Sequence, residues 1–390
     1  MNQFSSELIK KAKDTKARVT RVCTPHGEFM TPTFMPVGTR AGVNNMSPAE
    51  LRYSGSQIIL GGNTYHMLLA PGMEVIKKAG GMHAFMGWQG PMLTDSGGFQ
   101  IFSLSKNKEI CSIDENGAHF KASEEGRIIH MTPECSLETQ KIIGADIIMA
   151  FDQCTPDSCS HSETARIMER THRWLGQSIA YQERDPNSIY GFRQALFGII
   201  QGGTYRDLRE ASAAFIASQN LDGIAIGGET IGFDMEKTVE VIRWLIPYLT
   251  EEKPRYTMGV GMSPQDLLDV IAEGIDIFDC VAPTRNARHG ALYCGKLVSH
   301  GAWFRFESEY EQSRIQIKKA CFASDLNPIM DDCYCYTCQH YSRSYLHQLF
   351  KQKANLFTAL ASIHNIHVMH DLCARMRAHI LSSEERHDFN

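Results

Sequence analysis

The chain has 390 residues, of which 43% are hydrophobic and 21% charged, with 31 glycines and 14 prolines. This composition is typical of a globular protein and excludes a disordered, collagen-like or fibrous chain. No apolar run approaches the roughly 20 residues that span a bilayer, and the first twenty positions lack the apolar stretch of a secretory signal, so we expect a cytoplasmic protein. The length fits two domains, or one α/β barrel with an appended module.

The net charge of −5 is unevenly distributed along the chain. Residues 281–390 hold 13 Lys and Arg against 10 Asp and Glu, whereas the first 280 residues hold 26 against 34. A basic end on an acidic protein suits a polyanion such as nucleic acid, although an excess of three charges is weak evidence by itself.

Predicted strands and helices alternate along the chain. Residues 18–30 alternate weakly in polarity and predict a β-hairpin, within residues 1–30, that covers the bottom of the fold. Eight short apolar, β-branched runs follow, at residues 33–37, 57–60, 91–94, 146–151, 196–200, 223–226, 256–260 and 276–278. The clearest helical segments between them are residues 161–182, 205–219, 234–249 and 264–272, with Asp234 and Ser263 as N-caps.

Eight strand–helix alternations without a Gly-rich dinucleotide fingerprint predict an α/β fold, a (β/α)8 TIM barrel over residues 31–283. Residues 284–364 are expected to form a loop and a separate subdomain, and residues 365–390 a helix that packs on the barrel. Active sites of such barrels gather at the C-terminal strand ends. The candidates there are Asp95, Asp152, Gln201, Gly227, Gly228, Met258 and Asp279. A single Asp at a strand end is often only a helix cap. Candidate residues from six strands that meet at one barrel mouth instead favour an active site.

Asp95 opens a segment, Asp95 to Gln100, in which Gly97 and Gly98 allow a tight turn with free N–H groups beside a carboxylate. Phe99 is either a stacking face for a planar heterocycle or a core residue. Two aspartates at one barrel mouth are typical of retaining glycosyl transfer, in which one attacks the anomeric carbon and the other moves protons. The residues alone do not assign the attacking aspartate.

Asp279 is followed closely by Arg285 and Arg288. A carboxylate beside two arginines is either a structural ion pair or a place where a phosphate backbone meets a catalytic acid.

Three of the twelve cysteines, Cys333, Cys335 and Cys338, lie within six residues. This spacing predicts a zinc site, because a tetrahedral shell of three thiolates and one imidazole leaves no place for water and is structural. The fourth ligand is one of four histidines, and spacing does not choose among them: His340, His347, His364 and His367.

Eight segments in order resemble those of bacterial tRNA-guanine transglycosylases, also called queuine tRNA-ribosyltransferases. They are DSGGFQ at 95–100, FDQCTP at 151–156, QGG at 201–203, MGVG at 258–261, FDC at 278–280, PTRNAR at 283–288, CYCYTC at 333–338 and IHN at 363–365. The resemblance runs from about Lys16 to the C-terminal helix, and it implies that residues 284–364 form an RNA-contacting loop and a Cys3His zinc subdomain. It implies a cytoplasmic homodimer that exchanges guanine at the wobble position of GUN-anticodon tRNAs for a 7-deazaguanine, with one structural Zn²⁺ per subunit and no nucleotide cofactor.

The resemblance also implies roles for single residues. Asp279 corresponds to the nucleophile, Asp95 to the general acid and base, and His364 to the fourth zinc ligand. The base-binding residues would be Asp95, Ser96, Gly97, Gly98, Phe99, Asp152, Gln201, Gly227, Gly228, Glu229 and Met258. The tRNA contacts would be Gly259, Val260, Gly261, Met262, Ser263, Pro264, Gln265, Asp266, Thr284, Arg285, Asn286, Ala287 and Arg288.

Two stretches depart from the family's pattern. Members usually read GGLAVGE where this chain has GGETIGF at 227–233, so Glu229 replaces a Leu and Phe233 replaces a Glu. We hypothesise that Glu229 accepts hydrogen bonds from a larger 7-substituent, which would make queuine rather than preQ1 the incoming base. The loop GMSPQ at 261–265 is one residue longer than usual, which would shift an RNA phosphate contact and leave the chemistry intact.

Two other classes of protein fit part of the sequence. A TIM-barrel glycoside hydrolase also uses two acids, but it needs neither a Cys3His subdomain nor the arginine-bearing segment. A non-catalytic tRNA-binding homologue is expected to lack the nucleophile, whereas Asp279 and Asp95 are both present.

Overall fold

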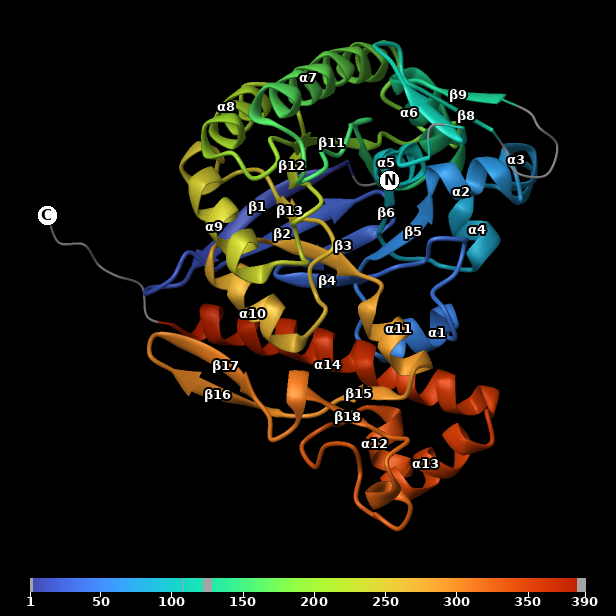
Figure 1. Ribbon diagram of the computed structural model, residues 1–390, viewed down its shortest axis with the longest axis vertical. Coiled ribbons are helices and arrows are strands. Elements are labelled where there is room, and N and C mark those ends of the chain that lie inside the picture. The colour runs from blue at the N-terminus through green and yellow to red at the C-terminus, as the bar shows by residue number, and fades with distance from the viewer. Residues whose placement is uncertain (1–2, 108, 122–127, 384–390) are drawn as a thin grey trace, which may run out of the picture.

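The computed structural model describes residues 3–107, 109–121 and 128–383, and its centre is a closed parallel barrel (Figure 1). The strands pair in the order β4, β14, β13, β12, β11, β10, β6, β5, and a parallel bridge between Val37 and Leu60 joins the two ends. Their bounds are β4 (Thr33–Pro36), β5 (Ile59–Asn63), β6 (Met92–Asp95), β10 (Ile147–Met149), β11 (Ala195–Ile200), β12 (Gly223–Ile226), β13 (Arg255–Thr257) and β14 (Ile277–Cys280). The predicted (β/α)8 barrel is therefore confirmed, and each predicted run overlaps one strand.

Helices surround the barrel. The longer ones are α6 (Pro133–Ile143), α7 (His161–Arg184), α8 (Arg206–Ala217), α9 (Met235–Leu245) and α10 (Pro264–Ala272). Asp234 caps α9 by accepting the N–H of Lys237, and Ser263 begins α10 in a capping box with Asp266, as predicted. Shorter helices follow the early strands: α1 (Pro48–Tyr53), α2 (Thr64–Leu69), α3 (Met73–Ala79), α4 (Met82–Met86) and α5 (Gly98–Ser105).

The N-terminal segment is a three-stranded antiparallel sheet rather than the single hairpin that the sequence predicts. Its strands are β1 (Ser5–Lys11), β2 (Arg18–Thr24) and β3 (Gly27–Met30). Val22 and Phe29 from this sheet are buried in the same cluster as the barrel residues Met35, Ile147 and Phe197. The sheet therefore covers the N-terminal end of the barrel and leaves the opposite end open.

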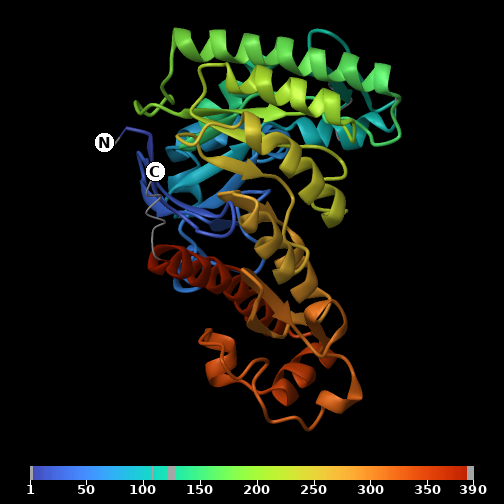
Figure 2. The same ribbon diagram turned by 90° about the vertical axis from the view of Figure 1, so that its left-hand side faces the viewer.

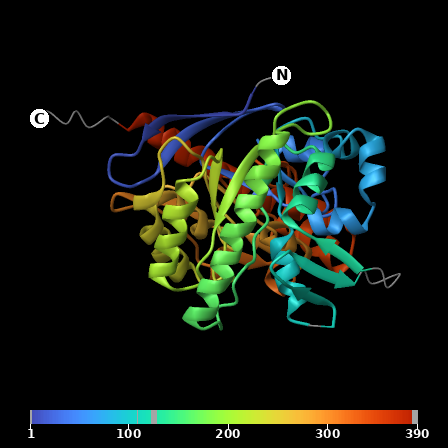
Figure 3. The same cartoon turned by 90° about the horizontal axis from the view of Figure 1, so that it is seen from above.

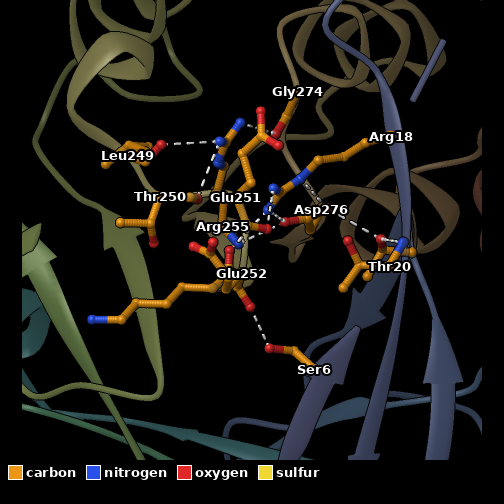
Figure 4. A network of polar contacts seen from close by, with 12 residues as sticks. Ser6, Arg18, Thr20, Leu249, Thr250, Glu251, Glu252, Arg255, Gly274 and Asp276 are labelled. Carbon is orange, nitrogen blue, oxygen red and sulfur yellow. Dashed lines mark hydrogen bonds and ion pairs between the residues drawn. The ribbon is translucent and has the colours of Figure 1, made fainter. Parts of the chain in front are cut away.

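A buried ion pair fixes this sheet to the barrel (Figure 4). The guanidinium of Arg18 donates to Asp276, with 3.1 Å from Nε to Oδ1, and both side chains are buried. The backbone N–H of Arg255 and the hydroxyl of Thr31 also donate to the same carboxylate. The Arg18 guanidinium and the Asp276 carboxylate therefore compensate each other's charge at the end of β14 that lies away from the mouth.

A small sheet is inserted between α5 and α6, which the sequence analysis does not predict. It consists of β7 (Cys111–Ile113), β8 (Ala118–Lys121) and β9 (Ile128–Met131), and its buried face packs with Phe151 and Trp174.

The C-terminal part extends from one side of the barrel (Figure 2). It contains α11 (Ala282–Arg288), the strand pair β15 (Ala291–Tyr293) and β18 (Arg314–Gln316), the hairpin β16 (Lys296–His300) and β17 (Trp303–Glu307), α12 (Tyr336–His340), α13 (Arg343–Lys351) and α14 (Asn355–Ser382). The segment from Ala282 to Arg288 is thus a helix where we predict a loop.

Helix α14 joins the two parts of the molecule. It begins at Asn355, ten residues before the predicted start; residues 384–390 of the predicted helix lie outside the described residues. Its first turns pack in the cluster that contains the three cysteines, and its later turns, such as Met369 and Met376, pack in the barrel's main cluster. Near its end it runs beside the N-terminal strands, where Lys10 donates to the carbonyl of Leu381 at 3.1 Å (Figure 3). No helix in the described part of the chain is long and apolar enough to cross a membrane.

Candidate active site and metal centre

A cavity of about 260 Å³ opens at the C-terminal ends of the barrel strands. The strand-end residues that the sequence predicts converge there, together with parts of both predicted tRNA-contact segments. Those that line it are Asp95, Ser96, Gly97, Gly98, Phe99, Asp152, Gln201, Gly227, Gly228, Met258, Gly259, Met262, Asp279 and Arg285. The structure thus brings residues from most of the barrel to one mouth, as expected of a TIM-barrel site.

Asp279 lies near the end of β14 and is buried against its neighbour strand β13. Oδ1 of Asp279 accepts the hydroxyl of Tyr256 at 2.5 Å and the backbone N–H of Gly259 at 3.2 Å. Burial raises the pKa of the Asp279 carboxyl, and these two hydrogen bonds oppose that rise because they stabilise the carboxylate. The arrangement holds one carboxylate oxygen and leaves the other free of these donors.

Asp95 ends β6 on the other side of the cavity and is held by four donors. The side-chain amide of Asn63, the N–H and hydroxyl of Thr64, and the N–H of Gly97 all donate to its carboxylate. Gly97 has a φ of 84°, a conformation that glycine adopts without strain. Burial outweighs the donors and raises the pKa of Asp95 to about 6, so this carboxyl can both give and take a proton near neutral pH.

Asp152 and Gln201 line the same cavity and hydrogen-bond to each other. Asp152 accepts the hydroxyl of Ser96 on Oδ1 and the amide of Gln201 on Oδ2, each at 2.8 Å. The buried Oε1 of Gln201 has no hydrogen-bond partner among the described residues. A Cβ on Gly98 would lie 2.3 Å from Oδ1 of Asp152, so only glycine allows this close approach. An orphaned acceptor beside a carboxylate suits the hydrogen-bonding edge of a planar base.

Three supporting residues escape sequence reasoning: Tyr256, Asn63 and Arg209. The Arg209 guanidinium is fully buried and donates to the carbonyls of Gly203 and Gly227, both at 2.7 Å, so it fixes the loops after β11 and β12. Burial lowers the pKa of Arg209 to about 10. Asn63 is recognisable only as the polar end of a strand, and no motif marks Tyr256 or Arg209.

Two aromatic side chains stand on the rim of the cavity. Phe99 is 49% exposed and Phe233 is 72% exposed, and both line the cavity. The alternative that Phe99 is a core residue is therefore wrong. Glu229, by contrast, does not line the cavity: its carboxylate pairs with Lys106 at 2.9 Å and accepts the N–H of Asp157 at 2.9 Å. These contacts lower the pKa of Glu229.

The predicted tRNA contacts divide between surface and interior. Arg285 lines the cavity and Arg288 is exposed, both on α11, and Met262 lines the cavity from the loop before α10. The interior members are Val260, Gly261, Pro264, Asp266, Thr284, Asn286 and Ala287. Ser263 is engaged with Asp266, and Gln265 accepts the N–H of Phe306 at 2.8 Å. These buried residues pack beneath the surface that Arg285, Arg288 and Met262 form.

The three cysteines meet His364 of α14. Its Nδ1 lies 3.8 Å from Sγ of Cys333, 3.5 Å from that of Cys335 and 3.3 Å from that of Cys338, and all four residues are buried. Nε2 of His364 lies 2.7 Å from the carbonyl of Tyr293, which can only accept, so Nε2 carries the proton and Nδ1 faces the thiols.

Among the four candidate histidines the geometry selects His364. His347 donates through Nδ1 to the carbonyl of Ile317 at 2.7 Å instead. The set fits a closed, tetrahedral structural metal site.

Comparison with known proteins decides the family. The family model described as "Queuine tRNA-ribosyltransferase" matches residues 13–387. The chain belongs to the queuine tRNA-ribosyltransferase family. Relatives with that name include one from Synechococcus elongatus, 43% identical over 100% of this chain and 94% of the relative. Others are from Nostoc sp., 43% identical over 99% and 96%, and from Halothermothrix orenii, 42% identical over 97% and 94%. A member of this family over its whole length is an enzyme of the pentosyltransferase class, which excludes the glycoside hydrolase alternative.

Proposed function

We propose that the protein is a tRNA-guanine transglycosylase that exchanges guanine at wobble position 34 for a 7-deazaguanine. Its tRNA substrates would be those with GUN anticodons, which carry Asp, Asn, His and Tyr. The observation that carries this proposal is a pair of aspartates from different strands, Asp279 and Asp95, that line one cavity together with Asp152 and Gln201.

In the first displacement, a carboxylate oxygen of Asp279 attacks C1′ of the wobble ribose. The C1′–N9 bond breaks, a bond from C1′ to Asp279 forms, and guanine leaves with the proton that Asp95 donates. The hydrogen bonds from Tyr256 and Gly259 favour the ionised form of Asp279 and so oppose the effect of its burial, and the ionised form is the one that attacks. No nucleotide cofactor is needed, because one glycosidic bond replaces another.

In the second displacement, Asp95 takes the N9 proton of the incoming 7-deazaguanine. The N9 electron pair then attacks C1′ and displaces Asp279, so that two inversions retain the configuration. The raised pKa of Asp95, about 6, suits a group that donates in one step and accepts in the next.

Asp152 and Gln201 would read the base. Asp152 is an acceptor for N–H groups of the guanine edge, and Oε1 of Gln201 is an acceptor without a protein partner in the described part of the chain. The exposed ring of Phe99 would stack on the heterocycle. Such recognition requires the wobble nucleotide to be splayed out of the anticodon loop, which is how single-stranded RNA is usually read.

Arg285 and Arg288 on α11 would contact tRNA phosphates, since Arg285 lines the cavity and Arg288 is exposed on the same helix. The Cys3His centre would hold Zn²⁺, because three thiolates and one imidazole suit this ion and fill its shell. The ion would tie α14 to the segment around Cys333 and supply no chemistry to the exchange. The homodimer implied by the sequence resemblance stays a prediction.

We propose queuine as the preferred incoming base. Glu229 is held by Lys106 and the Asp157 N–H, so it would have to leave these partners to meet a 7-substituent. Phe233 already lines the cavity and offers an apolar contact where relatives of the usual pattern would offer a carboxylate.

The experiment that tests the function is incorporation of labelled guanine into a GUN-anticodon tRNA by the full-length protein. Incorporation supports a transglycosylase. A folded, metal-loaded protein that binds this tRNA without incorporation would instead be the non-catalytic tRNA-binding homologue.

A further inference from the structure

A second cluster of metal-ligating side chains lies at the end of the barrel away from the active-site mouth. It comprises His26 in the turn between β2 and β3, His83 on α4, and Asp146 just before β10. Their ligand atoms all lie within 4.8 Å of one another. Three segments far apart in sequence therefore place two imidazoles on one buried carboxylate.

The distances in this cluster match those of a ligand shell. Nδ1 of His26 lies 2.8 Å from Oδ1 of Asp146, and Nε2 of His83 lies 3.5 Å from its Oδ2. The carbonyl oxygen of Gly90 is 3.0 Å from the same Nε2. Ligand bonds of about 2.0–2.2 Å place neighbouring donor atoms roughly 3–3.5 Å apart around one ion. The contacts of 3.0 and 3.5 Å have this spacing, and the contact of 2.8 Å is slightly shorter.

The two imidazoles lie against each other and beside an apolar ring. The rings of His26 and His83 stack with their centroids 3.6 Å apart and 17° between their planes. Phe192 packs edge-on against His26 at 4.9 Å and supplies an apolar side to the cluster. Asp146 is fully buried, whereas the His26 side chain is 28% exposed and leaves a path from solvent.

Asp146 is already oriented by the backbone. The N–H groups of His26 and Met92 donate to its two oxygens at 3.1 and 2.9 Å, so the carboxylate keeps its position whether or not an ion is bound. Outer hydrogen bonds of this kind are what hold a ligating carboxylate in place.

From this geometry we infer that His26, His83 and Asp146, with the carbonyl of Gly90, form a second metal site that binds a divalent transition-metal ion such as Zn²⁺, Co²⁺ or Ni²⁺. Imidazole with a carboxylate suits these ions better than it suits Mg²⁺ or Ca²⁺. On binding, the ring protons at Nδ1 of His26 and Nε2 of His83 move to the other nitrogen of each ring, and the freed lone pairs bind the ion. The ion would link the N-terminal sheet to the barrel and would take no part in the exchange reaction.

The test titrates Co²⁺ into the full-length protein with its Cys3His centre already filled with Zn²⁺. Visible d–d absorption and metal analysis after dialysis report the bound Co²⁺. We expect one added equivalent in the native protein, and at least about ten-fold weaker binding in His26→Gln and in His83→Gln. His161→Gln is the matched control, because His161 also pairs with an aspartate, Asp207, but on the exposed surface. It should bind Co²⁺ as the native protein does.

Two results would overturn the inference. One is that the native protein binds no equivalent beyond the Cys3His ion. The other is that His26→Gln and His83→Gln bind the second equivalent as tightly as His161→Gln does. Circular dichroism and the Zn²⁺ content of each variant show that the fold is kept. Asp146→Asn is avoided, since Asp146 also accepts two backbone N–H groups.

Discussion

The hydroxyl of Tyr256 donates to Oδ1 of Asp279 across 2.5 Å, from β13 to the neighbouring strand β14. Tyr256 pairs with Ile277 in the parallel register, and Asp279 stands two residues further on, so its side chain emerges on the same face of the sheet. The register of these two strands therefore places the Tyr256 hydroxyl where it can donate to the proposed nucleophile.

Tyr256→Phe should slow guanine exchange and move its acid limb to higher pH. The lost hydrogen bond stabilises the ionised form of Asp279, so its removal raises the pKa of that carboxyl further and depletes the attacking carboxylate. We expect kcat to fall about ten-fold, as for a hydrogen bond to a charged group. The pH profile of exchange at saturating tRNA measures this, and an unchanged profile would remove Tyr256 from the account.

The two half-reactions should respond to pH in opposite directions. Asp95, with a pKa of about 6, must be protonated to release guanine and ionised to accept the incoming base's proton. Between about pH 6 and 8, single-turnover guanine release should therefore slow while base incorporation from the covalent complex should quicken. Asp95→Asn should abolish both dependences. If both steps changed with pH in the same direction, Asp95 could not be the group that carries the proton in both.

Arg288→Ala should weaken tRNA binding without loss of fold, because Arg288 is exposed on α11. KM for tRNA should rise, and the log–log salt slope of affinity should fall by about one. Arg184→Ala is the matched control: Arg184 is an exposed arginine at the end of α7, paired with Glu134. Equal KM values for the two variants would count against a phosphate contact by Arg288.

Cys335→Ser should release the structural metal and lower the melting temperature of the C-terminal part. The thiolate is one of four ligands, and the cysteines are also part of that region's buried cluster. Cys321→Ser, at an exposed cysteine outside the cluster, should change neither metal content nor melting. Metal analysis and calorimetry measure both, and a full metal complement in Cys335→Ser would contradict the proposed centre.

Competition between preQ1 and queuine tests the hypothesis on base preference. Native protein should show the higher kcat/KM for queuine, and Glu229→Leu should reduce that preference. Phe233→Leu, which shortens the rim aromatic, separates an effect of the Glu229 carboxylate from one of the cavity wall. A clearly higher kcat/KM for preQ1 in the native protein would refute the hypothesis.

The barrel could be predicted from sequence because its strands are fully buried and therefore read as short apolar runs with turns between them. The helix caps Asp234 and Ser263 were equally readable, since a capping side chain acts within three residues of itself. The three strands of β7–β9 were missed, because they are short, half exposed and carry little hydrophobic signal.

Contacts between distant segments explain the other differences. Spacing could not choose His364 among four histidines, because α14 brings it to the cysteines from 26 residues beyond Cys338. The partners of Glu229 and the carbonyls held by Arg209 likewise depend on loops that meet only in the folded chain. The sequence predicts a loop from Ala282 to Arg288 because a proline and two arginines lie in this short segment. The structure shows a helix there, and one face of that helix is buried.

The role of Asp279 as nucleophile is tested by labelled-guanine incorporation into a GUN-anticodon tRNA by native protein, Asp279→Ala and the surface control Asp207→Asn. We predict incorporation by the native protein and the control, with none by Asp279→Ala, and a denaturation-resistant protein–RNA complex only where Asp279 is present. Incorporation by a folded Asp279→Ala at the native rate would contradict the account.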